Sequence, residues 1–265
     1  AALTDRATAQ SPVERGLSGE PWDGVFAVLR RPRSRVRITV PGATESFVQY
    51  FLGSGAEGDG LVGCWLEGDG LRVSYPWTEE DVVSLVSQVV LPTPPETTEM
   101  DALVLGAEGL AALCASVDAI RSQFFAAMAD RRTDVEYRID RAALGRQAAA
   151  ASESTDARWL MPMLRLTAFL APVTDDAINR GLAALVEYGL LVGVQDDWRP
   201  GPALLALATW WRDPLPAISC ETTLFNGDRV SQHEHRVVIR GNGPLCVLHQ
   251  TGGPTGGLPV TIGAV

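Results

Sequence analysis

The chain contains no lysine, and all 22 of its basic residues are arginines. This absence excludes any chemistry that needs a lysine amine, such as P-loop phosphate binding, a pyridoxal-phosphate Schiff base, a protein-kinase lysine or a Ser-Lys dyad. The G-x-S-x-G and H-E-x-x-H patterns are also absent, and no G-x-G-x-x-G leads into a helix. We therefore expect no catalytic residues and no cofactor, and the sequence favours a protein that is not an enzyme.

Cysteines and long apolar runs are also scarce. The four cysteines, Cys64, Cys114, Cys220 and Cys246, are far apart and form no C-x-x-C pair, which argues against a disulfide scaffold or a zinc ribbon. No run approaches the ~18 apolar residues of a membrane span, and the polar stretch 1–20 lacks the apolar core of a signal peptide. We expect a soluble, cytoplasmic protein without a membrane span.

Acidic residues outnumber basic ones, which gives a net charge of −10. This balance disfavours nucleic-acid partners, because neutralisation of phosphates supplies most non-specific affinity. Five arginines between positions 30 and 37 are a local exception. Strand alternation puts Arg33, Arg35 and Arg37 on one face and Val36, Ile38 and Val40 on the other. That basic face is either a solvated strand surface or a contact site for an acidic segment of a partner or of the same chain.

The spacing of turns and apolar residues predicts an α+β fold, with antiparallel β-meander units at both ends flanking a helical middle. The expected parts are a flexible tail at 1–20, an N-terminal meander plus helix at 21–95, a helical region at 100–215 and a C-terminal antiparallel β unit at 216–265. Thr78 opens the N-terminal helix with a T-x-x-D capping box. The stretches VGCWLEGDGLRVSY and PLCVLHQTGG…GLPVTIGA share a cysteine-containing strand, a glycine turn and a second strand, which suggests a quasi-duplicated sheet.

Within the helical region, the segment 156–213 has a winged-helix-like pattern. A helix capped by Thr174 ends at Gly189 and is followed by a hairpin and a further helix. The hairpin carries Asp196 and Asp197, and acidic residues at this place disfavour contact with DNA phosphates. A winged-helix DNA-binding regulator therefore stays an alternative function, while a protein-interaction module is preferred.

All three histidines of the chain, His233, His235 and His249, lie close together in the sequence. If Gly241–Gly243 forms a three-residue turn, His235 faces His249 across two strands. A two-residue turn would move His249 to the opposite face of the sheet. A metal-dependent enzyme using these three residues is an alternative function, but the glutamate that follows His-x-His in cupins is absent. The preferred interpretation is an ordinary sheet face without metal.

Residues 61–96, LVGCWLEGDGLRVSYPWTEEDVVSLVSQVVLPTPPE, have the order strand, glycine turn, strand, helix and proline stop. In this order, and in the acidic, lysine-free composition typical of a GC-rich bacterium, about a third of the chain resembles the EspG family of cytosolic type VII secretion chaperones. The resemblance implies an adaptor or dedicated chaperone that binds another protein, and we carry no binding residues over from it. The residues themselves lead us to expect partner contacts at Arg33, Arg35, Arg37, Asp196, Asp197 and Trp198.

Overall fold

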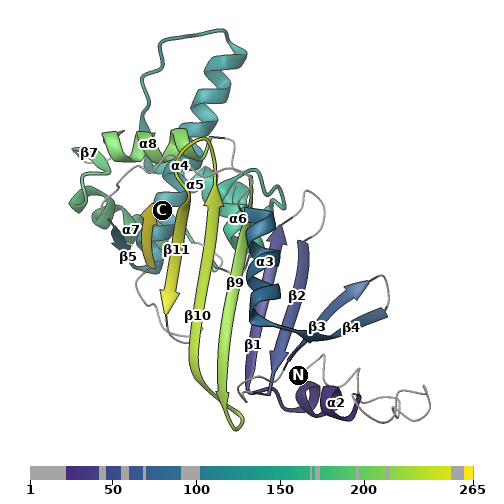
Figure 1. Ribbon diagram of the computed structural model, residues 1–265. Helices are drawn as coiled ribbons and strands as arrows, with labels where there is room; N and C mark the ends of the chain where they lie inside the picture. The colour runs from purple at the N-terminus through teal and green to yellow at the C-terminus, as the bar shows by residue number, and fades with distance from the viewer. Residues whose placement is uncertain are drawn as a thin grey trace.

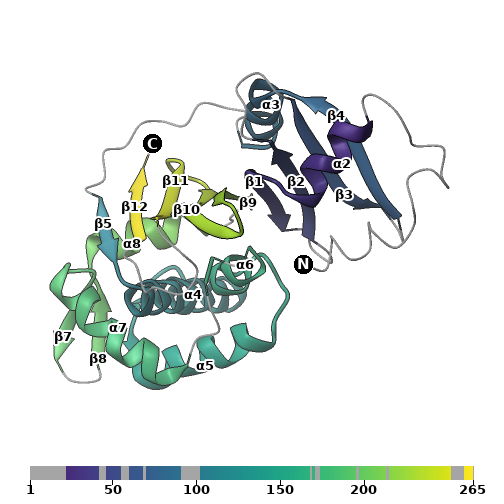
Figure 2. The same cartoon turned by 90° about the horizontal axis from the view of Figure 1, so that it is seen from below.

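The computed structural model describes residues 22–41, 46–54, 60–67, 70–90, 102–167, 169–170, 174–194, 197–212, 215–251 and 260–264. Across these ranges the protein is α+β, as the sequence predicts, with one large antiparallel sheet that carries helices on both faces (Figures 1 and 2). The tail expected at 1–20 lies outside the described residues.

The two β units expected at the ends of the chain form a single nine-stranded sheet with the order β4-β3-β2-β1-β9-β10-β11-β12-β5. The N-terminal strands are β1 (Ser34–Pro41), β2 (Ser46–Gly53), β3 (Leu61–Glu67) and β4 (Gly70–Trp77). The remaining strands are β5 (Leu103–Leu105), β9 (Leu215–Asn226), β10 (Arg229–Arg240), β11 (Cys246–Thr251) and β12 (Val260–Ala264). The two units join because β1 pairs antiparallel with β9 from Ser34 to Thr39.

The strand order has an approximate two-fold symmetry about the β1–β9 pair. On each side a meander runs outwards, so that β3 and β11 hold equivalent positions, as do β4 and β12. Cys64 lies on β3 and Cys246 on β11. The similarity of the two cysteine-containing stretches in the sequence therefore corresponds to equivalent places in the sheet.

The helices divide between the two faces of the sheet (Figure 2). One face carries the helical region over β10 to β12, and it carries α2 (Trp22–Arg30) over β2 and β3. The helical region consists of α4 (Ala107–Ala129), α5 (Arg141–Glu153), α6 (Leu160–Leu166), α7 (Asp175–Glu187) and α8 (Pro202–Trp210). On the opposite face, α3 (Glu79–Val90) packs Val82 against Ile38 and Phe51.

The centre of the helical region is α4. Every residue from Gly109 to Arg121 is buried, and the core around them joins the other helices to the sheet. Of the helices in the described ranges, α4 is the one long and apolar enough to cross a membrane, but 72% of its apolar window is buried inside the protein. This burial is what a core helix requires.

Two helix boundaries follow from caps that the sequence predicts. At the start of α3, the Asp81 amide donates to Thr78 Oγ1 at 3.1 Å and the Thr78 amide donates to Asp81 Oδ2 at 2.8 Å, which is the expected capping box. At the start of α7, the Ala177 amide donates to Thr174 Oγ1 at 3.3 Å. Helix α7 is followed by Gly189 with a φ of +65°, a conformation that favours glycine.

A second, three-stranded sheet lies beside the helical region. Its strands are β6 (Ile139–Asp140), β7 (Leu191–Val194) and β8 (Asp197–Pro200), in the order β6-β8-β7. The hairpin expected after Gly189 is therefore present as β7 and β8. Strand β6, however, comes from before residue 156, so the small sheet reaches upstream of the segment 156–213 for which we predict a winged-helix-like pattern.

Candidate functional site

Polar side chains gather at the centre of the large sheet, on the face that carries the helical region. Two rows of directly paired residues cross β1, β9 and β10 there, and paired residues point to the same face of a sheet. We call these residues, together with Ser219, the polar seam: Arg37, Glu221 and His235 in the first row, and Arg35, Thr223 and His233 in the second. Figure 2 shows α2 and α6 on this face, on either side of β1 and β9.

Glu221 is the one carboxylate of the polar seam, and it accepts hydrogen bonds from two arginines. Its Oε1 accepts a hydrogen bond from Arg35 NH2 at 3.0 Å, and its Oε2 accepts one from Arg37 NH1 at 3.4 Å. Arg35 NH2 also donates to Thr223 Oγ1 at 3.2 Å. The seam therefore has a local excess of positive charge, although the chain as a whole has a net charge of −10.

The polar seam is also short of hydrogen-bond acceptors. The Nε atoms of Arg35 and Arg37 are buried and make no hydrogen bond with the part of the chain that the structure describes. A buried donor without an acceptor costs on the order of 1–3 kcal/mol. The two side chains are still accessible, since 34% of Arg35 and 26% of Arg37 is exposed. This half-open, electropositive arrangement is suited to accept a carboxylate from another molecule.

The other end of the seam is closed by the segment that follows α6. Ser219 Oγ lies 2.6 Å from His235 Nε2 and 3.4 Å from the carbonyl oxygen of Thr167. The Phe169 ring contacts the His235 ring at a centroid distance of 4.8 Å. Burial lowers the pKa of His235 to about 4, so its imidazole is neutral near pH 7. Ser219 is 2% and His235 5% exposed, so this Ser-His pair is buried from solvent.

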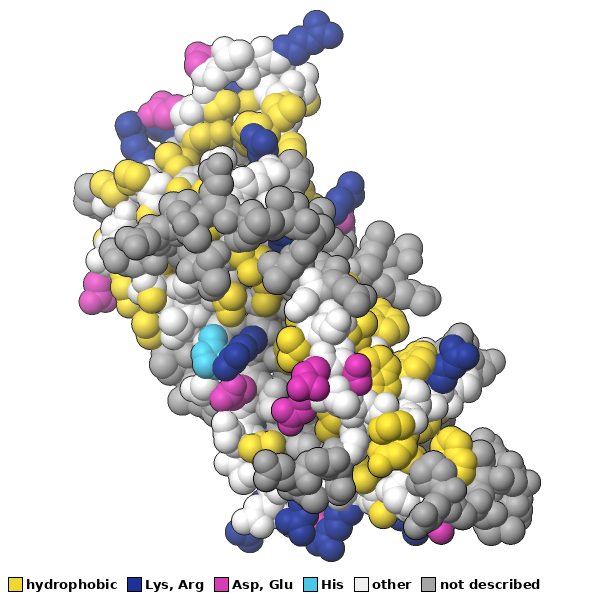
Figure 3. All heavy atoms as spheres, viewed as in Figure 1, with side chains coloured by type: hydrophobic (Ala, Val, Ile, Leu, Met, Phe, Trp, Pro, Cys, Tyr) yellow, Lys and Arg dark blue, Asp and Glu magenta, His cyan; other side chains and the backbone are white. Residues whose placement is uncertain are grey.

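The three histidines are not brought together. Strands β10 and β11 pair His249 with Arg236 rather than with His235, so His249 points to the other face of the sheet. There its Nε2 lies 3.9 Å from Glu234 Oε2, and Figure 3 shows a histidine on this face beside a basic and an acidic side chain. The three-residue turn that would align the histidines is absent, because the loop after β10 is longer. Within the described ranges, no group of three His, Cys, Asp or Glu residues could hold a metal ion.

The other residues expected at a partner surface are dispersed. Arg33 is exposed just before β1, two residues before Arg35, which with Arg37 forms the open end of the polar seam. Asp197 is exposed on β8. Asp196 lies outside the described residues. The side chain of Trp198 is 7% exposed and packs in the main core. Strand pairing opposite Gly193 turns this indole inwards.

A buried ion pair on α4 escapes sequence reasoning. Asp118 and Arg121 are each 3% exposed and lie 2.9 Å apart. The Asp118 carboxylate also accepts hydrogen bonds from the amides of Leu160 and Met161, both at 3.0 Å, and so it caps the start of α6. Arg121 stacks over Trp159 at 4.9 Å from the ring centroid. The i, i+3 spacing of opposite charges in an otherwise apolar helix is the one available signal.

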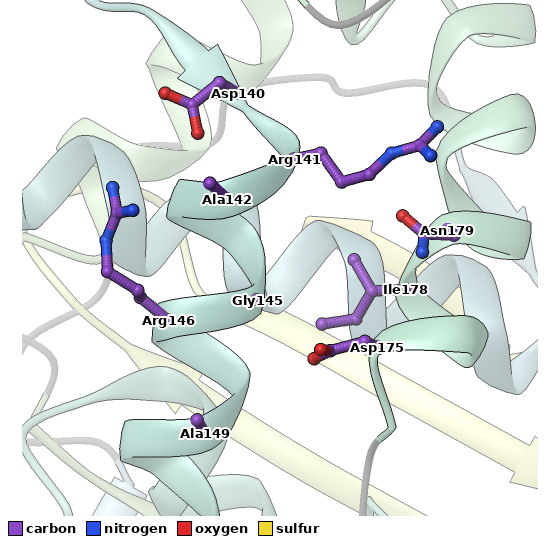
Figure 4. Close-up of a pocket in the computed structure, with 9 residues that line it drawn as sticks. All are labelled: Asp140, Arg141, Ala142, Gly145, Arg146, Ala149, Asp175, Ile178 and Asn179. Atoms are coloured by element: carbon purple, nitrogen blue, oxygen red, sulfur yellow. The ribbon is translucent and has the colours of Figure 1, made fainter.

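A groove lies between α5 and α7, with a volume of about 730 Å³ (Figure 4). Its floor is mainly apolar and its rim is charged. The lining residues are Asp140, Arg141, Ala142, Gly145, Arg146, Ala149, Asp175, Ile178 and Asn179. Sequence reasoning misses this groove, because α5 has no distinct apolar face and the two helices meet only in the folded chain.

The fold and the polar seam together define an α+β protein built on one continuous antiparallel sheet with an electropositive centre. A similar solved structure is that of the Mycobacterium tuberculosis type VII secretion system chaperone EspG5 in complex with the PE25-PPE41 dimer. The TM-score is 0.45 and the sequence identity 10%, over 96% of this chain and 77% of that chain. No family model and no curated protein matches the sequence.

Proposed function

We propose that the protein is a non-enzymatic adaptor or dedicated chaperone that binds another protein through the open end of the polar seam. The observation that carries this proposal is the imbalance within the seam: two guanidinium groups share the Glu221 carboxylate, and both Nε donors are buried without an acceptor among the described residues. A partner carboxylate would bind the exposed part of the two guanidinium groups and neutralise the excess charge. We therefore expect the partner to present an acidic segment.

A polypeptide fits the polar seam better than a nucleic acid does. Glu221 lies between the two arginines, and the rest of the chain is acidic, so a continuous phosphate backbone would meet repulsion on all sides. A single Asp or Glu side chain brings one negative charge to two guanidinium groups that share the one Glu221 carboxylate. The proposal that the protein acts in a bacterial secretion or assembly system rests on the resemblance of residues 61–96 to the EspG family.

The test is to identify the partner and then to remove the seam's charge. The tagged full chain is purified from its native host at several salt concentrations, and a co-purifying protein is produced separately and titrated by calorimetry. Arg35→Gln with Arg37→Gln should lower the affinity at least about tenfold, because the partner carboxylate loses both guanidinium groups. The matched control is Arg229→Gln, an exposed arginine at the start of β10.

Two outcomes would count against the proposal. The first is a protein that purifies alone at every salt concentration. The second is a partner whose affinity is the same for the wild type and the seam variant, with the variant's circular dichroism unchanged. Weakening of the wild-type complex by salt is also expected, because the contact is charged and only partly buried.

A further inference from the structure

We infer that Glu221 determines which anions the polar seam accepts: it selects an Asp or Glu side chain of the partner and disfavours a phosphorylated one. Because this role concerns the acidic group that the partner presents, it rests on the function proposed above. Glu221 is then a specificity residue as well as a hydrogen-bond acceptor for two arginines.

Glu221 is close to the surface that a partner would contact but is less accessible than the arginines. Its side chain is 14% exposed, whereas 34% of Arg35 and 26% of Arg37 is exposed. Strands β1 and β9 pair Arg37 directly with Glu221 and Arg35 with Thr223. An incoming anion would therefore contact the two guanidinium groups while the Glu221 carboxylate stays beside them.

The Glu221 carboxylate divides its two oxygens between the arginines. Its Oε1 accepts from Arg35 at 3.0 Å and its Oε2 from Arg37 at 3.4 Å. His233 Nδ1 lies nearer to Thr223 Oγ1, at 3.2 Å, than to Glu221 Oε1, at 3.9 Å, so the arginines are the main partners of the carboxylate. Apart from its histidines, the seam carries two positive charges and one negative charge, which is a net charge of +1.

A site with this net charge favours an anion that carries a single charge. The attraction between site and anion grows in proportion to the charge of the anion, whereas the cost of removing the anion from water grows with the square of that charge. A carboxylate carries one negative charge, and a phosphoserine carries about 1.5 to 2 at pH 7. The carboxylate matches the seam, while the phosphate keeps uncompensated charge next to Glu221 and is repelled by it.

Two substitutions at position 221 separate charge from shape. Glu221→Gln keeps the size of the side chain and one acceptor oxygen for the arginines, but it raises the net charge of the seam. Glu221→Asp keeps the negative charge and shortens the side chain by one methylene. A role that depends on charge survives Glu221→Asp and is lost in Glu221→Gln, whereas a role that depends on packing is altered by both.

The probes are three synthetic nine-residue peptides of Gly and Ala with blocked ends, which carry Asp, phosphoserine or Asn at the centre. Their affinities for the full chain are measured by NMR titration at pH 7.5, which detects weak binding. The wild type should bind the Asp peptide more tightly than the phosphoserine peptide and should not bind the Asn peptide. Glu221→Gln should reverse this order and change the ratio of the two affinities at least about tenfold. Glu221→Asp should keep the wild-type order.

Two further variants serve as controls, and circular dichroism confirms the folding of each. Glu234→Gln also removes a carboxylate that pairs with an arginine, at 3.0 Å from Arg236, but strand alternation places it on the opposite face of the sheet. This variant should keep the wild-type order. Arg35→Gln with Arg37→Gln should abolish binding of both charged peptides.

Four results would overturn the role of Glu221: no binding of the Asp peptide to the wild type, a wild type that favours the phosphoserine peptide, an unchanged ratio in Glu221→Gln, or a reversed order in Glu221→Asp. The proposed function is tested separately with the natural partner. If the arginine double variant weakens that complex while Glu221→Gln leaves the peptide ratio unchanged, only the role of Glu221 is wrong. If the double variant leaves the complex unchanged, the proposed function itself is wrong.

Discussion

Mild acid should destabilise this protein through one side chain, His235. The imidazole is 5% exposed, lies 2.6 Å from Ser219 Oγ and packs on the Phe169 ring. Burial is the main reason that the pKa of His235 falls from its ordinary value of 6.5 to about 4, and the positive charge of Arg37 acts in the same direction while Glu221 opposes it. Protonation in the folded state would therefore place a charge in a site built for a neutral ring.

The size of the effect follows from the difference in proton binding. Between pH 6.5 and 4 the unfolded chain binds a proton at His235 that the folded chain does not. The neutral imidazole therefore stabilises the folded state fully above pH 6.5, and this stabilisation is lost as the pH falls towards 4. At about 1.4 kcal/mol per pKa unit, the full loss is on the order of 3 kcal/mol. About 2 kcal/mol of it should be lost by pH 5.

The assay is urea unfolding of the wild type and of His235→Gln between pH 7.5 and 4.5. The glutamine side chain can still form a hydrogen bond with Ser219 but does not titrate. Its free energy of unfolding should be lower than that of the wild type at pH 7.5, and the gap should close as the pH falls. His249→Gln, on the opposite face and 33% exposed, should keep the wild-type pH dependence. Parallel curves for the wild type and His235→Gln would refute the reasoning.

Three further predictions concern packing and edges. Asp118→Ala should lower the free energy of unfolding by about 3–5 kcal/mol, because it removes the carboxylate that neutralises the buried Arg121 guanidinium. Asp156→Ala, at an exposed pair, should cost under about 1 kcal/mol. Gly145→Ala should stabilise α5 by about 1 kcal/mol, while Gly181→Ala should cost about 1–3 kcal/mol, since its Cβ would collide with the α4 backbone. Tyr188→Phe removes a 2.9 Å hydrogen bond to the edge strand β5 and should speed amide exchange there, as mass spectrometry would show.

Local patterns were enough to predict most elements of the fold. The Thr78 capping box and the Thr174 cap depend on side chains within three residues of the amides that they accept from. The alternation from Arg33 to Arg37 predicts a strand with one basic face, and β1 has that face. These signals can be recognised in the sequence because each side chain acts on a part of the backbone that is close to it in the chain.

The candidate sites were harder to predict, because they depend on pairing over long distances. Arg35 and Arg37 carry no indication that their shared carboxylate is Glu221, almost two hundred residues further on. The register between β10 and β11 depends on one loop, and a shift of one residue sends His249 to the opposite face. Trp198 looks like an exposed hairpin residue until the strand pairing shows which way it points.

The sequence by itself determined the absence of lysine, the α+β succession of the elements and the basic face of β1, because composition and periodicity act locally. Only the tertiary structure decided that the two β units share one sheet and that a single carboxylate serves two arginines at its centre. It also decided that α5 and α7 enclose a groove. Each of these features forms where distant segments meet, and which segments meet is fixed by burying the whole apolar surface at once rather than by any one stretch of the chain.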